Sequence, residues 1–211
     1  MNIDFFTFRE SLFPQGIFST DHIKRFFPGF NTDNLLNWQK KEYIFKLRNK
    51  WYCFREVLST PDADMLIANE IYSPSYISHQ QALMFYGLIP EHIVSSTSVT
   101  TKKTNTFEVR GRKYAYYSVK PALFFGYHLL PVTLNGLTRY VKIAEKEKAI
   151  LDLLYLYKFY KTRDDIEQLR FNEHIMQEEV NWLRLSQYAD RFGFSIMKNK
   201  VSHLKALFEY D

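Results

Sequence analysis

The pattern of apolar and polar residues between Ser19 and Phe54 predicts two helices followed by a two-stranded hairpin. The first helix opens at Ser19 or Thr20, because either hydroxyl can cap its free N–H groups. Apolar residues recur at helical spacing at Ile23, Phe26 and Phe27, and we expect them to face the core. Pro28-Gly29 ends this first helix, because proline lacks the backbone donor that a helix needs. A second helix then reaches about Lys41, and its apolar face is formed by Leu35 and Trp38.

The predicted hairpin turns at Asn49-Lys50, where asparagine readily supplies the positive φ of a tight turn. A two-residue turn pairs Arg48 with Trp51, Leu47 with Tyr52, Lys46 with Cys53 and Phe45 with Phe54. Because side chains alternate along a strand, one face then carries Phe45, Leu47, Tyr52 and Phe54. The other face carries Lys46, Arg48 and Trp51. We therefore expect one face that packs on the protein and one that offers cations near the tip.

Helix, turn, helix and hairpin are the parts of a winged helix-turn-helix, which places its second helix in a DNA groove. The candidate DNA-binding residues, chosen for base edges and phosphates, are Thr32, Asn34, Asn37, Lys40, Lys41, Lys46, Arg48 and Lys50. From Asp21 to Arg55 the chain has eight Lys or Arg and three Asp or Glu, a net +5 that equals the net charge of the whole chain. This local excess favours nucleic acid. The alternative is a protein-docking unit whose hairpin cations are simply solvated.

The rest of the chain predicts a second, mixed domain. An opening helix is expected over 4–13, and the break at LSTPDAD places a domain boundary at about residue 58. The expected domains are thus 1–58 and 59–211, and the fold class is α+β, with the winged unit followed by a mixed β-sheet and helix domain with a helical C-terminal end. A strand is expected over 93–101 and a hairpin about Gly111-Arg112. His79 begins a predicted helix and is expected at the surface or hydrogen-bonded, because no matching metal ligand is nearby.

The segment AEKEKAILDLLYLYKFY predicts an amphipathic helix. Its apolar residues fall at i, i+3, i+4 and i+7, at Ile150, Leu153, Leu154 and Tyr157. A second face carries Glu145, Lys148 and Asp152 at spacings of three and four. We interpret this face as a structural ladder of ion pairs, which contributes a few tenths of a kcal/mol per pair when exposed. Contact with a partner is the lesser alternative.

Composition narrows the class of function. The single Cys53 excludes an internal disulfide, and no Cys/His cluster has the spacing of a zinc site, so no metal and no cofactor are expected. No GxGxxG loop, GxSxG elbow or HExxH helix is present, and catalysis is not expected. The N-terminus lacks a signal pattern and no apolar run is long enough to span a bilayer, so we expect a cytoplasmic protein without membrane contact.

Five segments in order, YISHQQALMFYGLIP, VSSTSVTT, FEVRGRKYAYYSV, LFFGY and EKAILDLLYL, together resemble the AbiEi antitoxin family. The family consists of transcriptional regulators of type IV toxin–antitoxin systems, and the resemblance covers nearly the whole chain. It implies binding to double-stranded DNA at inverted repeats in the protein's own promoter. It also implies a functional partner, a nucleotidyltransferase-like toxin, with which no stable complex is required. Lys50 departs from the pattern, because the family's wing often carries glycine there.

These observations together predict a DNA-binding autorepressor and antitoxin without catalysis. One rival is a stand-alone transcriptional regulator that has no toxin partner. The other is a protein-docking module that does not bind DNA.

Overall fold

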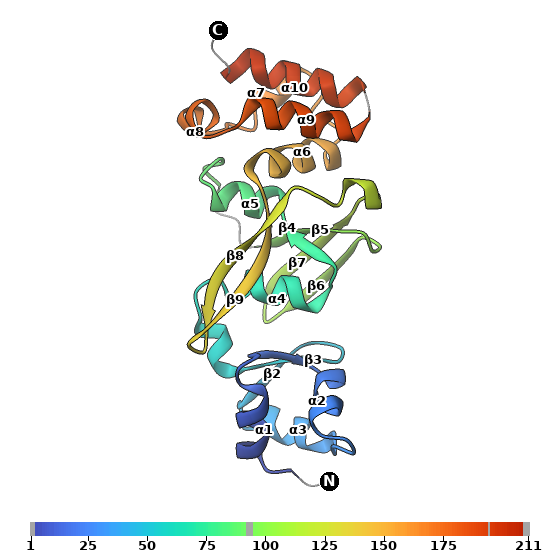
Figure 1. Cartoon of the computed structure of the whole chain (residues 1–211), viewed down its shortest axis with the longest axis vertical. Helices are drawn as coiled ribbons and strands as arrows, with labels where there is room; N and C mark the ends of the chain where they lie inside the picture. Colours follow the sequence, from blue (N-terminus) through green and yellow to red (C-terminus); the bar gives the residue numbers. More distant parts are fainter. Residues whose placement is uncertain (1–2, 92–94, 194, 209–211) are drawn as a thin grey trace. The chain divides into compact units, whose positions relative to one another are not determined.

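The computed structural model describes residues 3–91, 95–193 and 195–208 and has an α+β fold (Figure 1). The chain forms two compact units. The first runs from the start of the described chain to Ser73 and includes Leu130–Val141. The second contains Pro74–Leu129 and the chain from Lys142 onward. Residues 93 and 94 of the predicted strand and 209–211 of the last predicted helix lie outside the described residues.

The first unit combines short helices with a small antiparallel sheet. Its elements are α1 (Phe5–Leu12), β1 (Ile17–Ser19), α2 (Thr20–Phe26), α3 (Asp33–Lys40), β2 (Ile44–Arg48), β3 (Trp51–Phe54), the 3-10 helix η1 (Arg55–Ser59) and α4 (Ala63–Ile71). The sheet order is β1-β3-β2, and α1, α2 and α3 lie together beside it (Figure 1). The sequence pattern predicted α1, α2, α3 and the hairpin, but it did not indicate the three-residue strand β1.

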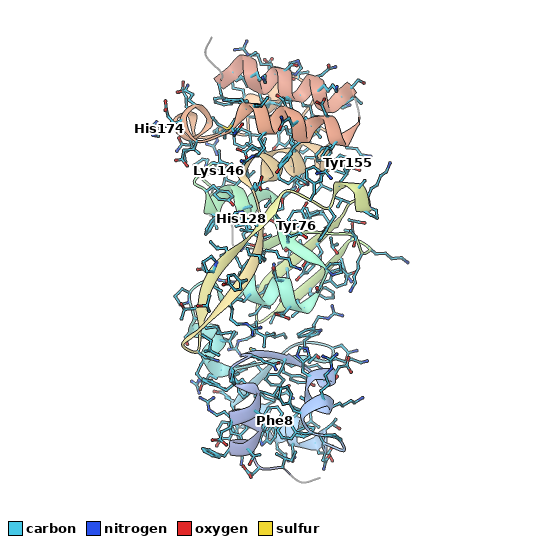
Figure 2. The ribbon with its side chains drawn as sticks, in the orientation of Figure 1. Phe8, Tyr76, His128, Lys146, Tyr155 and His174 are labelled. Carbon is cyan, nitrogen blue, oxygen red and sulfur yellow. The ribbon has the colours of Figure 1, made fainter. Side chains whose placement is uncertain are left out.

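An aromatic core holds this unit together. Phe8 is fully buried, and its ring centroid lies 5.4 Å from that of Phe18, 4.5 Å from that of Trp38 and 6.1 Å from that of Phe54. Figure 2 labels Phe8 inside the unit. Aromatic rings bury large apolar areas, so one Phe can join a helix to the sheet and to α3. Leu35 and Trp38 are buried as predicted.

The structure confirms the predicted cap of α2 but contradicts the predicted burial of one of its apolar residues. Ser19 caps the helix with a capping box, in which its Oγ accepts from the His22 N–H at 3.2 Å. Phe26, however, is 49% exposed, so its predicted place in the core is wrong. The helix ends at Phe26, and the next residue, Phe27, turns inward to stack on Phe8 at 6.0 Å instead.

The β2–β3 hairpin has the predicted turn but a shifted register. Arg48 pairs with Trp51 as expected, whereas Lys46 pairs with Tyr52 because of a β-bulge between Lys46 and Arg48. The positive φ of 67° falls on Lys50, not on Asn49, in a backbone region that favours glycine. The bulge turns Leu47 into the protein while Lys46 stays exposed. The predicted division into an apolar and a basic face therefore fails at Phe45, which is only partly buried. Cys53, which the prediction assigned to neither face, is fully buried.

The first unit extends beyond the boundary predicted at residue 58. It runs to Ser73 and contains α4, most of whose residues are buried. Residues 130–141, from far along the chain, complete the unit: the Asn135 side-chain amide donates to the Phe13 carbonyl at 2.7 Å. Gly16 has a φ of +68°, a backbone conformation that favours glycine, and an added Cβ there would lie 2.6 Å from Leu134 Cδ2. The composition break at LSTPDAD marks a surface turn and not the edge of the unit.

The second unit is built on a mixed sheet whose full strand order is β6-β7-β5-β4-β9-β8. The strands of this sheet are β4 (Ser75–Ile77), β5 (Ser96–Thr100), β6 (Asn105–Val109), β7 (Arg112–Ser118), β8 (Tyr127–Leu134) and β9 (Leu137–Ala144). Residues 130–141 of β8 and β9 belong to the first unit. β4 runs antiparallel to β5 and parallel to β9, and β5 runs parallel to β7. Arg110 and Gly111, both with positive φ, form the β6–β7 turn, one residue before the predicted position.

The helices of this unit are α5 (His79–Phe85), α6 (Lys146–Leu156), α7 (Arg163–Glu167), α8 (Glu173–Glu178), α9 (Trp182–Phe192) and α10 (Ser195–Phe208), with a 3-10 turn η2 (Pro121–Leu123). Figure 1 shows α6 between α5 and the layer of C-terminal helices. That position explains why α6 is apolar on several sides and not on a single stripe: its residues from Glu147 to Leu154 are all buried. Within the described residues, no helix combines the length and apolar character needed to cross a membrane.

Candidate functional site

The predicted DNA-binding residues divide by exposure into two groups. Thr32, Asn37, Lys40, Lys41, Lys46 and Lys50 are exposed. On α3, Asn37 and Lys40 share a face with Asp33 and Leu36, because these residues stand at helical spacing of three and four. Leu36 is 60% exposed at the centre of that face. The face therefore offers an amide and a cation around one apolar contact.

Asn34 and Arg48 are engaged within the protein instead. The Asn34 side-chain amide donates to the Ile3 carbonyl at 3.4 Å, and the residue is half-buried. Arg48 Nη1 donates to the Ile71 carbonyl at 2.7 Å, at the end of α4, and its guanidinium lies 5.7 Å from the Tyr72 ring centroid. A charged donor bonded to a helix-end carbonyl stabilises the fold. Substitution of Arg48 would therefore disturb the hairpin itself as well as any contact of Arg48 with a ligand.

The exposed cations of the first unit form a larger set than the prediction contained. Arg55 pairs with Glu42 at 3.6 Å. In contrast, six cations have no ion-pair partner among the described residues: Lys24, Arg25, Lys40, Lys41, Lys46 and Lys50. Lys24 and Arg25, in the last turn of α2, were in the charge count but not among the candidates. Their exposure could have been inferred, because they lie off the face that carries Ile23.

The predicted ladder on α6 is instead the centre of a buried polar cluster. Lys148 and Asp152 are fully buried and form an ion pair. Lys148 Nζ also donates to the Tyr76 hydroxyl at 2.9 Å. The Asp152 carboxylate accepts from the Tyr76 hydroxyl at 2.9 Å and from the Ser78 hydroxyl at 2.7 Å. The expectation of a weak, exposed ladder is therefore wrong, because α6 is covered on this side as well.

Glu145 does not belong to this cluster. Its carboxylate accepts from the Tyr188 hydroxyl at 2.7 Å and lies 3.6 Å from Arg184, both on α9. The buried neighbour Glu147 accepts from the Asn181 N–H at 2.8 Å, at the start of the same helix. The three predicted face residues are thus split: Lys148 and Asp152 fix α6 to β4, and Glu145 fixes it to α9.

Burial controls the electrostatics of the cluster. It lowers the pKa of Lys148, whereas the Asp152 carboxylate acts in the opposite direction. Burial, followed by the Asp152 charge, raises the pKa of Tyr76 well above its usual range. The Lys148 ammonium lies 5.1 Å from the Phe125 ring centroid and 5.2 Å from that of Phe192. With its partners satisfied and rings around it, the cluster has the character of a structural core.

His79, which was expected at the surface or in a hydrogen bond, lies in the core of the second unit. It is fully buried, with its ring centroid 5.0 Å from that of Tyr117 and 4.7 Å from that of Tyr157. Within the described residues, no group of three His, Cys, Asp or Glu side chains is placed to hold a metal ion. The buried ring packs against the aromatic rings of Tyr117 and Tyr157.

Acid should destabilise the protein through His79. Burial lowers the pKa of His79 from 6.5 to about 4, with Gln80 acting weakly in the other direction. Because the pKa is depressed, the stability that comes from a neutral His79 ring is fully present above pH 6.5 and is lost as the pH falls towards 4. The free energy of unfolding should drop by about 3 kcal/mol over this window from His79 alone. Urea titrations at several pH values should show a shallower dependence for His79→Phe, and an unchanged dependence would contradict the buried neutral ring.

Comparisons of the chain with models of protein families and with curated proteins return no match. Functional assignment therefore depends on the residues and their geometry, together with the resemblance of the five ordered segments.

Proposed function

We propose that the first unit is a winged helix-turn-helix and that the protein is a DNA-binding autorepressor. The observation that carries the proposal is the element order α1-β1-α2-α3-β2-β3 with the antiparallel sheet order β1-β3-β2. In a fold of this kind the second helix of the pair reads the groove and the hairpin contacts the neighbouring backbone. Here α3 would be the reading helix and the β2–β3 hairpin the wing.

The chemistry of α3 supports this assignment. Asn37 offers the amide that pairs with adenine, and Leu36 offers an apolar contact of the kind that thymine methyl groups accept. Lys40 and Lys41 stand at the C-terminal end, where cations are also favoured by the helix dipole. No direct base contact is assigned to Asn34, because its amide is bonded within the protein.

The six exposed cations of the first unit support contact with phosphates. Exposed cations without anionic partners are free to replace the counterions condensed on DNA, and this exchange supplies most non-specific affinity. They come from α2, α3 and the hairpin, that is, from the three elements that contact DNA in a winged module.

A reporter assay tests the proposal. The DNA upstream of the protein's own gene is fused to a reporter, and the full chain is supplied from a separate plasmid. The proposal predicts repression of this reporter and none of a reporter with a shuffled upstream sequence. Equal expression from both in the presence of the folded protein would reject autorepression.

Asn37→Ala should reduce sequence preference and not general affinity. Losing a base contact costs about 1–3 kcal/mol on the cognate site. Affinity for random DNA and the dependence of binding on salt should stay unchanged, because no phosphate contact is lost. Competition titrations with cognate and random duplexes measure both quantities. If Asn37→Ala weakens both duplexes equally, Asn37 is not a base contact.

The antitoxin role rests on the resemblance of the five ordered segments. We propose that it resides outside the DNA-reading surface, because all five segments lie within the second unit. Full-length Lys46→Gln/Lys50→Gln, impaired in DNA binding, should still restore growth when expressed with a neighbouring nucleotidyltransferase-like toxin. Failure of this variant, with the parent protein active and both equally abundant, would reject separable roles.

One observation favours the docking alternative. Leu36 and Phe26 are both large, apolar and exposed in the first unit, at 60% and 49%. Large apolar side chains that stay exposed are typical of protein contacts when they gather into one patch. A docking module would leave the reporter unaffected while retaining a folded first unit.

A further inference from the structure

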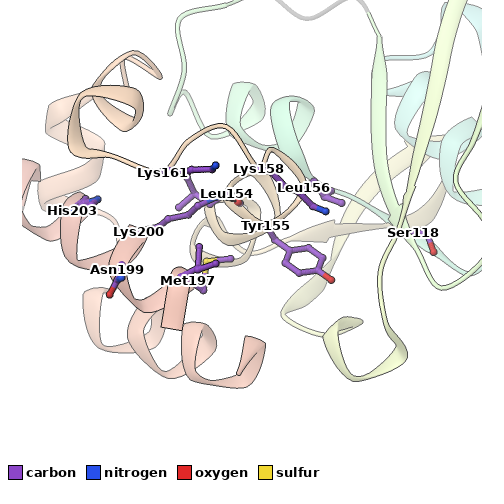
Figure 3. Close-up of a pocket in the computed structure, with 11 residues that line it drawn as sticks. Ser118, Leu154, Tyr155, Leu156, Lys158, Lys161, Met197, Asn199, Lys200 and His203 are labelled. Carbon is purple, nitrogen blue, oxygen red and sulfur yellow. Dashed lines mark hydrogen bonds between the residues drawn. The ribbon is translucent and has the colours of Figure 1, made fainter. Parts of the chain in front are cut away.

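A pocket of about 880 Å³ opens in the second unit at the C-terminal end of α6 (Figure 3). α10 forms one wall, and the segment that follows α6 forms another. The lining residues are Ser118, Leu154, Tyr155, Leu156, Lys158, Lys161, Ile196, Met197, Asn199, Lys200 and His203. The volume lies within the range of small-molecule sites, about 300–1,000 Å³.

The polar part of the lining is basic. Lys158, Lys161 and Lys200 line the pocket with His203, and none of the described lining residues is acidic. Lys158 and Lys161 are exposed and form no ion pair within the described part of the chain. Lys200 is only 3% exposed, and its ammonium donates to the Leu154 carbonyl and, at 3.3 Å, to the Tyr157 carbonyl. The two carbonyls that hold this ammonium are neutral, so no anion pairs with Lys200 through these bonds beside the pocket.

The positive charges of Lys161 and Lys200 repel each other. Burial and then the Lys161 charge lower the pKa of Lys200, while Asp165 acts in the opposite direction. The Asp165 carboxylate is occupied by the backbone N–H groups of Lys161 and Thr162, at 3.0 Å and 2.9 Å. An anion in the pocket would offset this repulsion, because opposite charges at close range favour the charged form of each group.

The remaining lining is largely apolar. Leu154 and Met197 are buried at the base, and Ile196 is 64% exposed at α10. A small inorganic ion would leave this surface uncovered, whereas a ligand with an apolar body would remove it from water.

We propose that this pocket binds an amphiphilic anion, a small molecule with one carboxylate or phosphate head and an apolar body. Lys158 and Lys161 contact the head, and the apolar body lies against Leu154, Met197 and Ile196. The site lies wholly in the second unit, so it does not depend on DNA binding by the first.

Three probes with the same eight-carbon chain separate head from body: octyl phosphate, octanoate and neutral 1-octanol. Calorimetric titration of the full-length protein should show saturable binding of at least one anionic probe. Its affinity should exceed that of octanol by about tenfold, the contribution of two partly exposed charge contacts. Comparison of the two anions identifies the preferred head. Equal binding of octanol would overturn the proposal, as would the absence of binding by both anions.

Two sets of variants locate the binding. Lys158→Gln/Lys161→Gln should lower the affinity for the anion about tenfold. The control Lys113→Gln/Lys198→Gln removes the same charge at exposed positions outside the pocket and should leave the affinity unchanged. Ile196→Glu places a carboxylate at the pocket and should abolish binding, while the neutral Ile196→Gln retains it at least in part. All four variants change exposed side chains, so melting curves should match the parent. Unchanged affinity in Lys158→Gln/Lys161→Gln or in Ile196→Glu would overturn the proposed site.

Discussion

Replacing Lys148 by alanine is expected to lower the free energy of unfolding by about 3–5 kcal/mol. The substitution removes the cation that faces Asp152 and leaves a carboxylate fully buried with only two hydroxyl donors. A buried charge without its partner is among the most destabilising changes in a protein interior. Urea unfolding followed by circular dichroism measures the loss.

Lys146→Ala is the matched control for this prediction. Lys146 lies two residues away on the same helix and pairs with the exposed Glu179, so its loss should change stability far less. The double variant Lys148→Met/Asp152→Leu should recover part of the stability, because neither charge of the pair remains buried. If Lys148→Ala and Lys146→Ala were equally stable, the cluster could not be the polar core described above.

The second large effect is expected on DNA binding. Lys46→Gln/Lys50→Gln should weaken binding to every DNA sequence by roughly tenfold or more at moderate salt. Both side chains are exposed on the hairpin, and phosphate contacts carry no sequence information. The slope of log affinity against log salt should become shallower by about two units, one for each lost contact. Anisotropy titrations at several salt concentrations provide both values.

The charge-matched variant Lys113→Gln/Lys198→Gln controls for net charge, because both of its lysines are exposed in the second unit. Its affinity and salt slope should match those of the parent. An equal loss of affinity in the two variants would show that binding depends on the net charge of the protein and not on the hairpin lysines. Arg48→Ala is unsuitable for this test, because the guanidinium bonds the Ile71 carbonyl and its loss would also disturb the fold.

Local signals in the sequence predicted much of the first unit. The Ser19 cap, the Pro28-Gly29 stop and the apolar pair Leu35 and Trp38 act over a few residues, and all three have the expected role. The bulge at Leu47 could not be predicted, because it depends on how the strand packs against residues outside the hairpin. The same bulge alters which hairpin side chains are buried.

Long-range contacts explain the remaining differences. The spacing of Lys148 and Asp152 is equally suited to an exposed ladder and to a buried pair. Only the positions of Tyr76 and Ser78, more than 70 residues earlier in the chain, decide between them. In the same way, Leu134 and Asn135 complete the first unit from a distant hairpin that no composition break indicates. The candidate DNA-binding residues were chosen for the chemistry of their side chains. Only the structure shows which of them are exposed, as Asn37 is, and which are half-buried, as Asn34 is.

The most direct test of the central claim is an anisotropy titration of the full-length protein with duplex DNA from its own promoter and with a shuffled duplex of the same composition. Binding to the promoter duplex should be tighter, and the salt dependence of binding to both duplexes should be reduced in Lys46→Gln/Lys50→Gln. Absence of binding to either duplex, or equal affinity for both at every salt concentration, would contradict sequence-selective DNA binding by the first unit.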